Sequence, residues 1–383
     1  MERKREIVFF PTRYCNFKCA HCGVKKSRDR HYISIHRTKK ILSKAKKQKF
    51  NRLCITGGGE PSINIKRMVQ IVKLAKKYGF KTRLVTNAFF MLRKDSREIL
   101  RNLKKNGLIR IGLNVDYFHL KFMSYRNTLK IIRTILDEGI NIGLAARANE
   151  NVFIKNLSII KKISKDLKGT IIRPVPIKYA GGHGGISRYE IIIGKKIIPA
   201  VISDVIRTEA NESFGQNNFK KMELKKLVFM RCLLRNTLID PEGTVLPCCG
   251  FNSVNYPALY RITDVNKLGE KNEIIKRDSL WKNILFGKFG FLKLYIRAKK
   301  NKKLEKIILE KKIYSICDLC KTFLEHKKEI AAIPSPSNLE ILRFVFTNFT
   351  IFIKEIVTRT YMLFFMHLRE IILWVYNWEE SFI

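Results

Sequence analysis

The chain has 383 residues, of which 46% are hydrophobic, so it is long enough for two domains and too apolar to be intrinsically disordered. Lysine and arginine number 76 and aspartate and glutamate 32, a formal net charge of +44 that favours anionic partners but says little about fold. Nine cysteines, most at metal-ligand spacing, and an amino terminus without an apolar signal segment argue against a secreted, disulfide-bonded protein and predict a cytoplasmic one.

Hydrophobic periodicity predicts alternating strands and helices over the first 175 residues. Strands are expected at residues 7–10, 53–55, 80–85, 108–115, 140–146 and 170–175. Helices are expected between them, at residues 34–49, 65–78, 96–106, 125–138 and 152–167. Such alternation gives parallel strands with outer helices, and six units are too few for a complete eight-unit barrel. We therefore predict an α/β fold, a partial barrel or open sheet, with its site at the carboxyl ends of the strands.

Three cysteines stand close together after the first predicted strand. Cys15, Cys19 and Cys22 are separated by three and then two residues. A zinc ribbon offers cysteine pairs from two loops, whereas three thiolates without a nearby fourth ligand suit an iron–sulfur cluster with one open iron. A zinc loop or unrelated buried thiols are the alternatives.

A glycine-rich motif follows the second predicted strand, where residues 56–61 read TGGGEP. Glycine lets the backbone approach a ligand closely, and Glu60 offers a carboxylate to an ammonium group. The alternative is a glycine-rich turn with a surface glutamate. The order of the two motifs, at the ends of successive strands, favours a shared ligand site.

Together the two motifs resemble those of radical SAM enzymes, CxxxCxxC and GGEP, with His21 at the aromatic position before the last cysteine. The resemblance implies a TIM-like partial (β/α)6 barrel over residues 1–180. It also implies a 4Fe–4S cluster held by Cys15, Cys19 and Cys22, with S-adenosylmethionine on its open iron. In this family an electron from the cluster cleaves that cofactor to a 5′-deoxyadenosyl radical, which abstracts hydrogen from a substrate.

The resemblance further implies which residues bind the cofactor. Gly58, Gly59 and Glu60 are expected to hold its methionine amino group, and Arg147 its carboxylate, because arginine suits planar carboxylates. Three further expected contacts lie at strand ends: Asn87, Asn114 and Asp116. For each polar residue a hydrogen bond within the protein is the alternative. For His119 a structural hydrogen bond is favoured over a role as acid or base.

A second set of cysteines lies beyond a bridging region at residues 181–228. Pro241-Glu242-Gly243 is a turn signal between two β-rich runs, which predicts a hairpin over residues 238–246. The cysteines expected to close a four-thiolate site are Cys232, Cys248, Cys317 and Cys320.

This second segment resembles the start of a SPASM domain or its shortened twitch relative. A full SPASM domain has seven cysteines and two auxiliary clusters, whereas five cysteines are present here, so the resemblance implies one auxiliary 4Fe–4S cluster in a small domain at residues 229–330. A structural zinc site with the same thiols is the alternative. Cys249 is a candidate catalytic hydrogen-atom donor; it is otherwise an alternative ligand or a buried thiol.

The carboxyl-terminal part is basic and then strongly apolar. Residues 288–312 are rich in lysine and predict a solvated helix, with contact to anionic lipid, nucleic acid or a partner as the alternative. Residues 338–383 are apolar, but charged residues interrupt them before the roughly 18 residues of a spanning helix are reached. We expect an amphipathic helical tail that docks on the barrel, a partner or a membrane surface.

These expectations combine into a radical SAM enzyme that acts on a peptide or protein, for cross-linking, epimerisation or maturation. Reduced flavodoxin or ferredoxin is the expected electron donor, and the tail is expected to make peripheral membrane contact. The alternatives are radical SAM modification of a lipid, sugar or RNA at an anionic surface, and a non-enzymatic, zinc-stabilised binding protein. The motif at Glu60 argues against the last, and nucleic acid is not the favoured partner.

Overall fold

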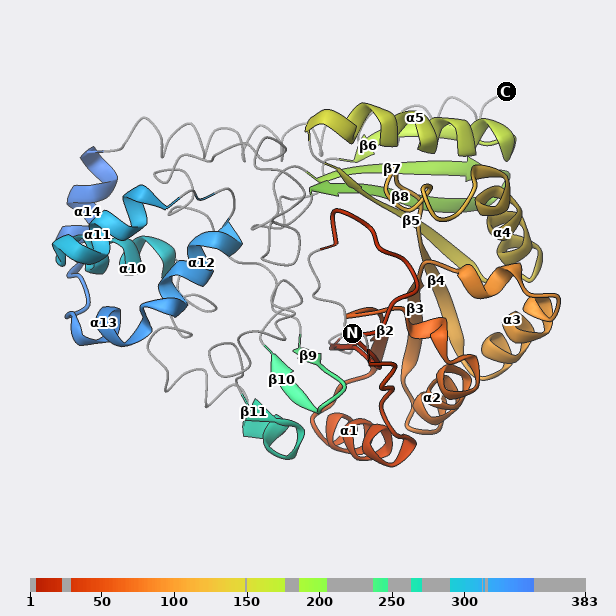
Figure 1. The fold of residues 1–383 in the computed structure, drawn as a ribbon, viewed down its shortest axis with the longest axis horizontal. Helices are drawn as coiled ribbons and strands as arrows, with labels where there is room; N and C mark the ends of the chain where they lie inside the picture. The colour runs from red at the N-terminus through yellow and green to blue at the C-terminus, as the bar shows by residue number, and fades with distance from the viewer. Residues whose placement is uncertain are drawn as a thin grey trace, which may run out of the picture.

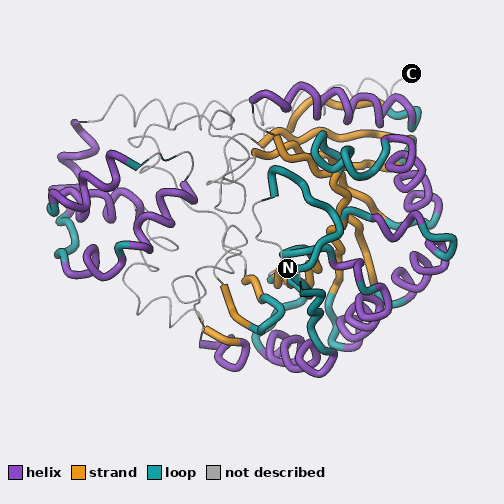
Figure 2. The backbone as a smooth tube through the Cα atoms, in the orientation of Figure 1, coloured by secondary structure: helices purple, strands orange, loops and turns teal. Residues whose placement is uncertain are grey.

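The computed structural model describes residues 5–22, 29–148, 150–175, 186–204, 237–246, 263–270, 290–311, 313 and 316–347. The strands within these residues form one sheet, in the order β11-β10-β9-β1-β2-β3-β4-β5-β8-β7-β6. Figure 2 shows this sheet as a curved layer with helices along its outer side, and Figure 1 shows the loop that follows β1 on the concave side.

The amino-terminal half builds the alternation that the periodicity predicts. Its strands, each parallel to the next, are β1 (Glu6–Phe9), β2 (Arg52–Ile55), β3 (Lys81–Thr86), β4 (Leu108–Asn114) and β5 (Asn141–Ala148). Its helices are α1 (Ile35–Lys47), α2 (Ile65–Lys77), α3 (Ser96–Lys105), α4 (Tyr125–Asp137) and α5 (Glu150–Asp166), with 3-10 turns η1 (Pro61–Ile63) and η2 (Phe89–Leu92). These predicted elements are confirmed, with ends that differ by at most two residues.

Local sequence explains where these helices begin, end and face. α1 and α4 begin after Ser34 and Ser124, whose hydroxyls accept the backbone N–H of the residue three positions on. The glycines that follow α2, α3 and α4 have positive φ: Gly79, Gly107 and Gly139. The buried face of α2 has the predicted helical spacing: Met68, Ile71, Val72 and Ala75. Such faces pack on buried strand residues and form one core.

The sixth parallel position of the sheet is not filled as predicted. β6 (Thr170–Val175) exists, but it does not pair with β5, so the prediction that it continues the parallel series is wrong. β8 (Lys196–Asp204) pairs parallel to β5, β7 (Ile186–Ile193) antiparallel to β8, and β6 antiparallel to β7. β7 and β8 are antiparallel because a tight hairpin at Gly194, whose φ is 53°, connects them without an intervening helix. The sheet therefore continues beyond residue 180.

A distant hairpin extends the other side of the sheet. β9 (Thr237–Ile239) and β10 (Thr244–Leu246) are antiparallel, as the turn at Pro241-Glu242-Gly243 predicts. β9 pairs parallel to β1, and β11 (Thr263–Asp264) pairs with β10 and leads into the 3-10 segment η5 (Val265–Glu270). The hairpin thus stands beside the strand that precedes the cysteine loop.

The carboxyl-terminal helices gather in a separate group (Figure 1). They are α10 (Gly290–Lys299), α11 (Lys302–Glu310), α12 (Ile316–Glu325), α13 (Lys327–Ala332) and α14 (Asn338–Thr347). α10 is buried almost throughout, and its Phe291 stacks on Phe323 of α12 with ring centroids 6.2 Å apart. The expectation of a solvated helix is therefore wrong for α10, because α11, α13 and α14 pack around it. Within the described residues, no helix is long and apolar enough to cross a bilayer.

Candidate active site

The three clustered cysteines lie on the loop after β1. Cys15, Cys19 and Cys22 are partly buried thiols on this loop. The backbone N–H of Phe17 donates to the Cys15 sulfur at 3.4 Å, and the N–H of Cys22 donates to the carbonyl of Cys19 at 3.1 Å. The Phe17 side chain, on the same loop, is buried. Three soft thiol ligands on one short, folded loop fit the donor set that a 4Fe–4S cluster requires.

The glycine-rich motif packs directly on the cysteine loop. The backbone N–H of Glu60 donates to the carbonyl of Tyr14 at 2.8 Å. A Cβ on Gly59 would lie 2.1 Å from that same carbonyl oxygen, and a Cβ on Gly57 would lie 1.8 Å from the carbonyl oxygen of Gly59. Gly59 is therefore required for the close approach of the two loops and Gly57 for the turn within its own loop, and Gly58 is buried beside them.

The Glu60 carboxylate is buried and joins the ends of β2 and β3. Its Oε1 accepts from the Ser62 backbone N–H at 2.8 Å and from the hydroxyls of Ser62 and Thr86, both at 2.6 Å. Its Oε2 accepts one bond, from the backbone N–H of Asn87 at 2.8 Å. A carboxylate oxygen has two lone pairs, so Oε2 keeps capacity for a further donor. Sequence reasoning missed Ser62, whose only signal was its position shortly after the second predicted strand.

Asn87 connects this network back to the cysteines. Its side-chain amide donates to the side-chain oxygen of Asn16 at 2.9 Å, and Asn16 lies between Cys15 and Cys19. The structure thus brings Glu60, Asn87 and the cysteine loop together. The bonds are made within the protein, which was the alternative stated for Asn87.

Asp116 is fully buried just beyond the end of β4. Its Oδ1 accepts from the backbone N–H of Phe118 at 3.0 Å, and from the backbone N–H and ring Nδ1 of His119 at 2.9 and 2.8 Å. Its Oδ2 accepts the backbone N–H of Arg147 at 3.1 Å. Burial alone would raise the pKa of Asp116, but the hydrogen bond and charge of His119 hold it below its usual range.

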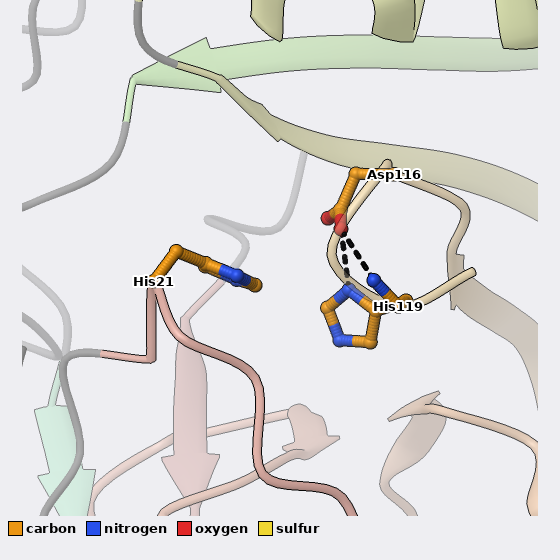
Figure 3. Close-up of side chains that lie close together, drawn as sticks. All are labelled: His21, Asp116 and His119. Atoms are coloured by element: carbon orange, nitrogen blue, oxygen red, sulfur yellow. Dashed lines mark hydrogen bonds and ion pairs between the residues drawn. The ribbon is translucent and has the colours of Figure 1, made fainter. Parts of the chain in front are cut away.

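His119 lies between Asp116 and the cysteine loop. Burial alone would lower its pKa, but its hydrogen bonds to Asp116 and to the Cys19 side chain raise the pKa of His119 to about 10. Figure 3 shows the imidazole beside the Asp116 carboxylate, with His21 across from it. The structural hydrogen bond favoured for His119 is therefore present, between its ring Nδ1 and the carboxylate of Asp116.

His21, Asp116 and His119 bring potential metal-ligand atoms within 4.8 Å of one another. The Asp116 oxygens already accept four hydrogen bonds, which identifies this carboxylate as a group that orients the histidine rather than as a ligand. The ring of His21 lies 4.5 Å from that of Phe118 and 5.3 Å from that of His119, between centroids.

Arg147 and Asn114 take different positions at the strand ends. The Arg147 guanidinium is exposed and donates to the Ser203 hydroxyl on β8 at 2.8 Å, while its carbonyl accepts from Asn156 of α5 at 2.8 Å. Asn114, the last residue of β4, is partly buried. Arg147 joins the Asp116 network through its backbone N–H.

The second cysteine set is described in part. Cys232, Cys248 and Cys249 lie outside the described residues; Cys317 lies on α12 without a described side chain, and Cys320 is buried on the same helix. The hairpin that precedes Cys248 is tied to the first site: Arg13 pairs with Asp240 at 2.9 Å and with Glu242 at 2.8 Å. This ion pair joins the β9–β10 turn to the residues just before Cys15.

Comparison with known proteins agrees with the motifs. Residues 9–149 match the Radical SAM superfamily. YydG of Bacillus subtilis, named for peptide biosynthesis, is 21% identical over 332 residues, which are 82% of this chain and 91% of YydG. AlbA of the same species, an antilisterial bacteriocin subtilosin biosynthesis protein, is 29% identical over 42% of this chain and 36% of its own length. An S-adenosylmethionine-dependent nucleotide dehydratase of Fibrobacter is 26% identical over 47% of this chain and 57% of its own length.

Proposed function

Because the chain is a radical SAM enzyme, with its radical SAM domain at residues 9–149, we propose that it abstracts a hydrogen atom from a peptide or protein substrate. A 4Fe–4S cluster, when bound, supplies the electron that cleaves S-adenosylmethionine to methionine and the 5′-deoxyadenosyl radical that takes this hydrogen. The protein is thus an enzyme, and the non-enzymatic binding alternative is set aside.

The docking of the two motif loops is the observation that carries the site assignment. Cys15, Cys19 and Cys22 would hold the cluster, and the 2.8 Å bond from Glu60 to Tyr14 keeps the glycine loop against them. The partly buried backbone of this loop and the remaining lone pair on Glu60 Oε2 would receive the cofactor amino group. Asn87, Asn114, Asp116 and Arg147 remain proposed cofactor residues.

A peptide substrate is supported by two relatives whose names refer to peptide or bacteriocin biosynthesis. YydG and AlbA are both named for the biosynthesis of peptides, and the similarity to YydG runs over 82% of this chain. The nucleotide dehydratase shares a shorter part, 47% of this chain, so a nucleotide or RNA substrate is the second candidate. The basic composition is compatible with either substrate.

For the distal cysteines we propose one auxiliary 4Fe–4S cluster on Cys232, Cys248, Cys317 and Cys320, with Cys249 as a hydrogen-atom donor to the substrate. Five thiols in the region and the ion pair that ties its hairpin to the cysteine loop support a site close to the first one. Metal analysis tests this: iron and sulfide for two clusters are expected, whereas stoichiometric zinc beside one cluster would show a structural zinc site.

The function is tested with anaerobically reconstituted protein and a chemical or flavodoxin reductant. Formation of 5′-deoxyadenosine is expected, and it should disappear when Cys15, Cys19 and Cys22 are all changed to Ala, while the distal metal is retained. Cleavage that persists in this triple variant would refute the cluster assignment.

The substrate class is tested separately, by co-expression with short peptides encoded next to the gene. Mass spectrometry in deuterated water is expected to show loss of hydrogen from a cross-linked peptide or gain of deuterium in an epimerised one. An enzyme that leaves every such peptide unchanged, but converts nucleotides and consumes S-adenosylmethionine with them, would overturn the peptide proposal and keep the radical SAM assignment.

A further inference from the structure

We propose that Arg110, flanked by Arg83 and Arg188 on the concave face of the sheet, binds a carboxylate group of the peptide substrate. The inference rests on the proposed function and deepens it, because it assigns an acidic peptide as the substrate. The arginines stand within the strands of the sheet rather than on the cysteine and glycine loops.

The three arginines lie on the face of the sheet that the helices do not cover. Strand residues alternate between the two faces of a sheet. The residue that follows each arginine belongs to the core that strands and helices share: Leu84, Ile111 and Tyr189. The arginine side chains therefore stand on the opposite, concave face, inside the curve of the sheet (Figure 2).

Two of the arginines have acidic partners, whereas Arg110 has none among the described residues. Arg83 donates to the Glu6 carboxylate through Nε and Nη2, at 2.8 and 2.6 Å. Arg188 Nη2 lies 3.2 Å from a carboxylate oxygen of Glu190. Arg110 stands directly beside Arg83 in the register of β3 and β4. Three guanidinium groups and two carboxylates thus leave one positive charge without a partner.

The surroundings of Arg110 disfavour its charge. Its guanidinium is partly buried against β5, where a Cβ on Gly143 would lie 3.1 Å from one of its nitrogens. Burial lowers the pKa of Arg110, and the like charges of Arg83 and Arg188 lower it further. The buried Nε of Arg188 has no hydrogen-bond partner among the described residues. An anion bound here would offset these costs, so the arrangement suits a ligand better than the fold alone.

A single carboxylate fits this group of arginines better than a phosphate does. The planar fork of a guanidinium bonds both oxygens of a carboxylate, as Arg83 bonds Glu6 on the same face. One unpaired positive charge matches one carboxylate. A phosphate dianion would leave excess negative charge beside Glu6 and Glu190.

The guanidinium of Arg110 lies within reach of a peptide that extends from the cofactor site. Gly112, Gly143 and Ala145, which share its face, are each partly exposed. Gly143 is beside Gly112 in the register, two residues before the end of β4, so about 7 Å of strand separates it from the strand ends. An extended peptide spans about 3.3 Å per residue, so an acidic residue a few positions from the reacting one can reach Arg110.

The test measures which peptides bind to the reconstituted full-length protein in the presence of S-adenosylmethionine. The probe is a random library of short synthetic peptides, prepared with free and with amidated carboxyl termini and read by mass spectrometry. Three variants are compared with the wild type: Arg110→Gln, Arg110→Lys and Gly143→Val, which places methyl groups where the guanidinium lies and keeps its charge. Arg126→Gln is the matched control, because it removes an equal charge from an exposed position on α4.

The wild type is expected to retain peptides enriched in Asp or Glu. Arg110→Gln and Gly143→Val should weaken the binding of these peptides about tenfold or more, because a charge-assisted pair is lost. Arg110→Lys should lie between, since an ammonium group keeps the charge but lacks the fork. Arg126→Gln should bind as the wild type does. Enrichment confined to peptides with free carboxyl termini would support the proposal, with the terminal carboxylate as the bound group.

Thermal denaturation without peptide separates binding from a structural role. Removal of an unpaired, partly buried charge costs the fold nothing, so Arg110→Gln is expected to melt no lower than the wild type. A lower melting temperature with unchanged peptide binding would show that Arg110 supports the fold, and would overturn the proposal. If Arg110→Gln does not fold, Arg110→Lys and Gly143→Val decide by the same comparison of binding. Unfolding of all three variants would identify the group as structural and also overturn it.

Equal loss of peptide binding in Arg126→Gln and Arg110→Gln would show that net charge alone attracts the peptides, against the proposal. Binding of a nucleoside diphosphate that depends on Arg110, without binding of acidic peptides, would overturn it in favour of a phosphate ligand. The proposed function fails on different evidence, namely a wild type that binds no cluster or does not cleave S-adenosylmethionine. A wild type that cleaves the cofactor but shows no preference for acidic peptides refutes only the role of Arg110.

Discussion

The sheet region and the carboxyl-terminal helices differ in how their helices are buried. α2 presents one apolar face to the strands and charged residues to solvent, with Met68, Ile71, Val72 and Ala75 at helical spacing. α10 is buried on nearly every side, with Phe291, Leu292 and Leu294 each at most 1% exposed. A helix that is apolar on one stripe can be recognised from its own sequence, whereas a helix buried all round depends on what other segments cover it.

The burial of a basic residue in α10 also depends on what other segments of the chain supply. Arg297 is 4% exposed because its guanidinium donates to the backbone carbonyls of Ile333 and Ala331, at 2.8 and 3.0 Å. These bonds give two backbone carbonyls at the carboxyl end of α13 a hydrogen-bond partner, and burial lowers the pKa of Arg297. A lysine- and arginine-rich segment therefore predicts a solvated face only when its charges have no internal acceptor.

The largest expected effect concerns the loop contact within the sheet region. Gly59→Ala would force a Cβ to within 2.1 Å of the Tyr14 carbonyl, so the glycine loop must separate from the cysteine loop. We expect loss of cluster binding and of 5′-deoxyadenosine formation, measured by iron content and product analysis. Gly194→Ala is the matched control, since its Cβ would meet nothing within 4 Å. Its positive φ costs about 1–2 kcal/mol, with the cluster retained. A Gly59→Ala protein with a full cluster would contradict the assigned contact.

The next effect tests the burial of α10. Phe291→Ala is expected to destabilise the carboxyl-terminal helices by about 3–5 kcal/mol, because it removes a buried ring that stacks on Phe323. Leu309→Ala in α11, where the side chain is 54% exposed, should change stability by less than about 0.5 kcal/mol. Chemical denaturation followed by circular dichroism measures both. Equal effects would mean that α10 is not the centre of this group.

A smaller effect should follow from cutting the tie between the hairpin and the cysteine loop. Asp240→Ala removes one carboxylate from Arg13 and a buried acceptor from the backbone N–H of Thr244, at 2.7 Å. A charged hydrogen bond of this kind contributes about 1.5–3 kcal/mol, so partial loss of the hairpin is expected. Hydrogen exchange at β9 should rise while exchange at β4 stays unchanged. Protection of β9 equal to wild type would show that strand pairing alone holds it.

The smallest effect on the fold is expected from the tail. Deletion after Thr347 preserves α14, whose Phe344 packs on Tyr295 at 5.8 Å and whose Glu340 pairs with Lys300 at 2.7 Å. We expect 5′-deoxyadenosine formation to persist and flotation with anionic liposomes to be lost. Each Lys or Arg near such a surface adds about 1 kcal/mol, so flotation of the full chain should weaken with salt. A truncated protein that still floats, or a full chain that never does, would refute membrane docking by the tail.

The sequence by itself determined the elements of the sheet region and the identity of its two motifs. Strands and one-faced helices follow from periodicity, caps and glycine stops, which act within a few residues. The cysteine spacing and the TGGGEP loop are likewise local, so their chemistry could be read before their geometry was known.

Only the tertiary structure decided the contacts between distant segments. That β8 rather than β6 lies beside β5, and that β9 lies beside β1, depends on competition among strands with similar sequences for the same sheet edges. The bonds from Thr86 to Glu60 and from Asn87 to Asn16 join residues on different strand ends. Their partners are set by strand order and register, which no local pattern of residues contains.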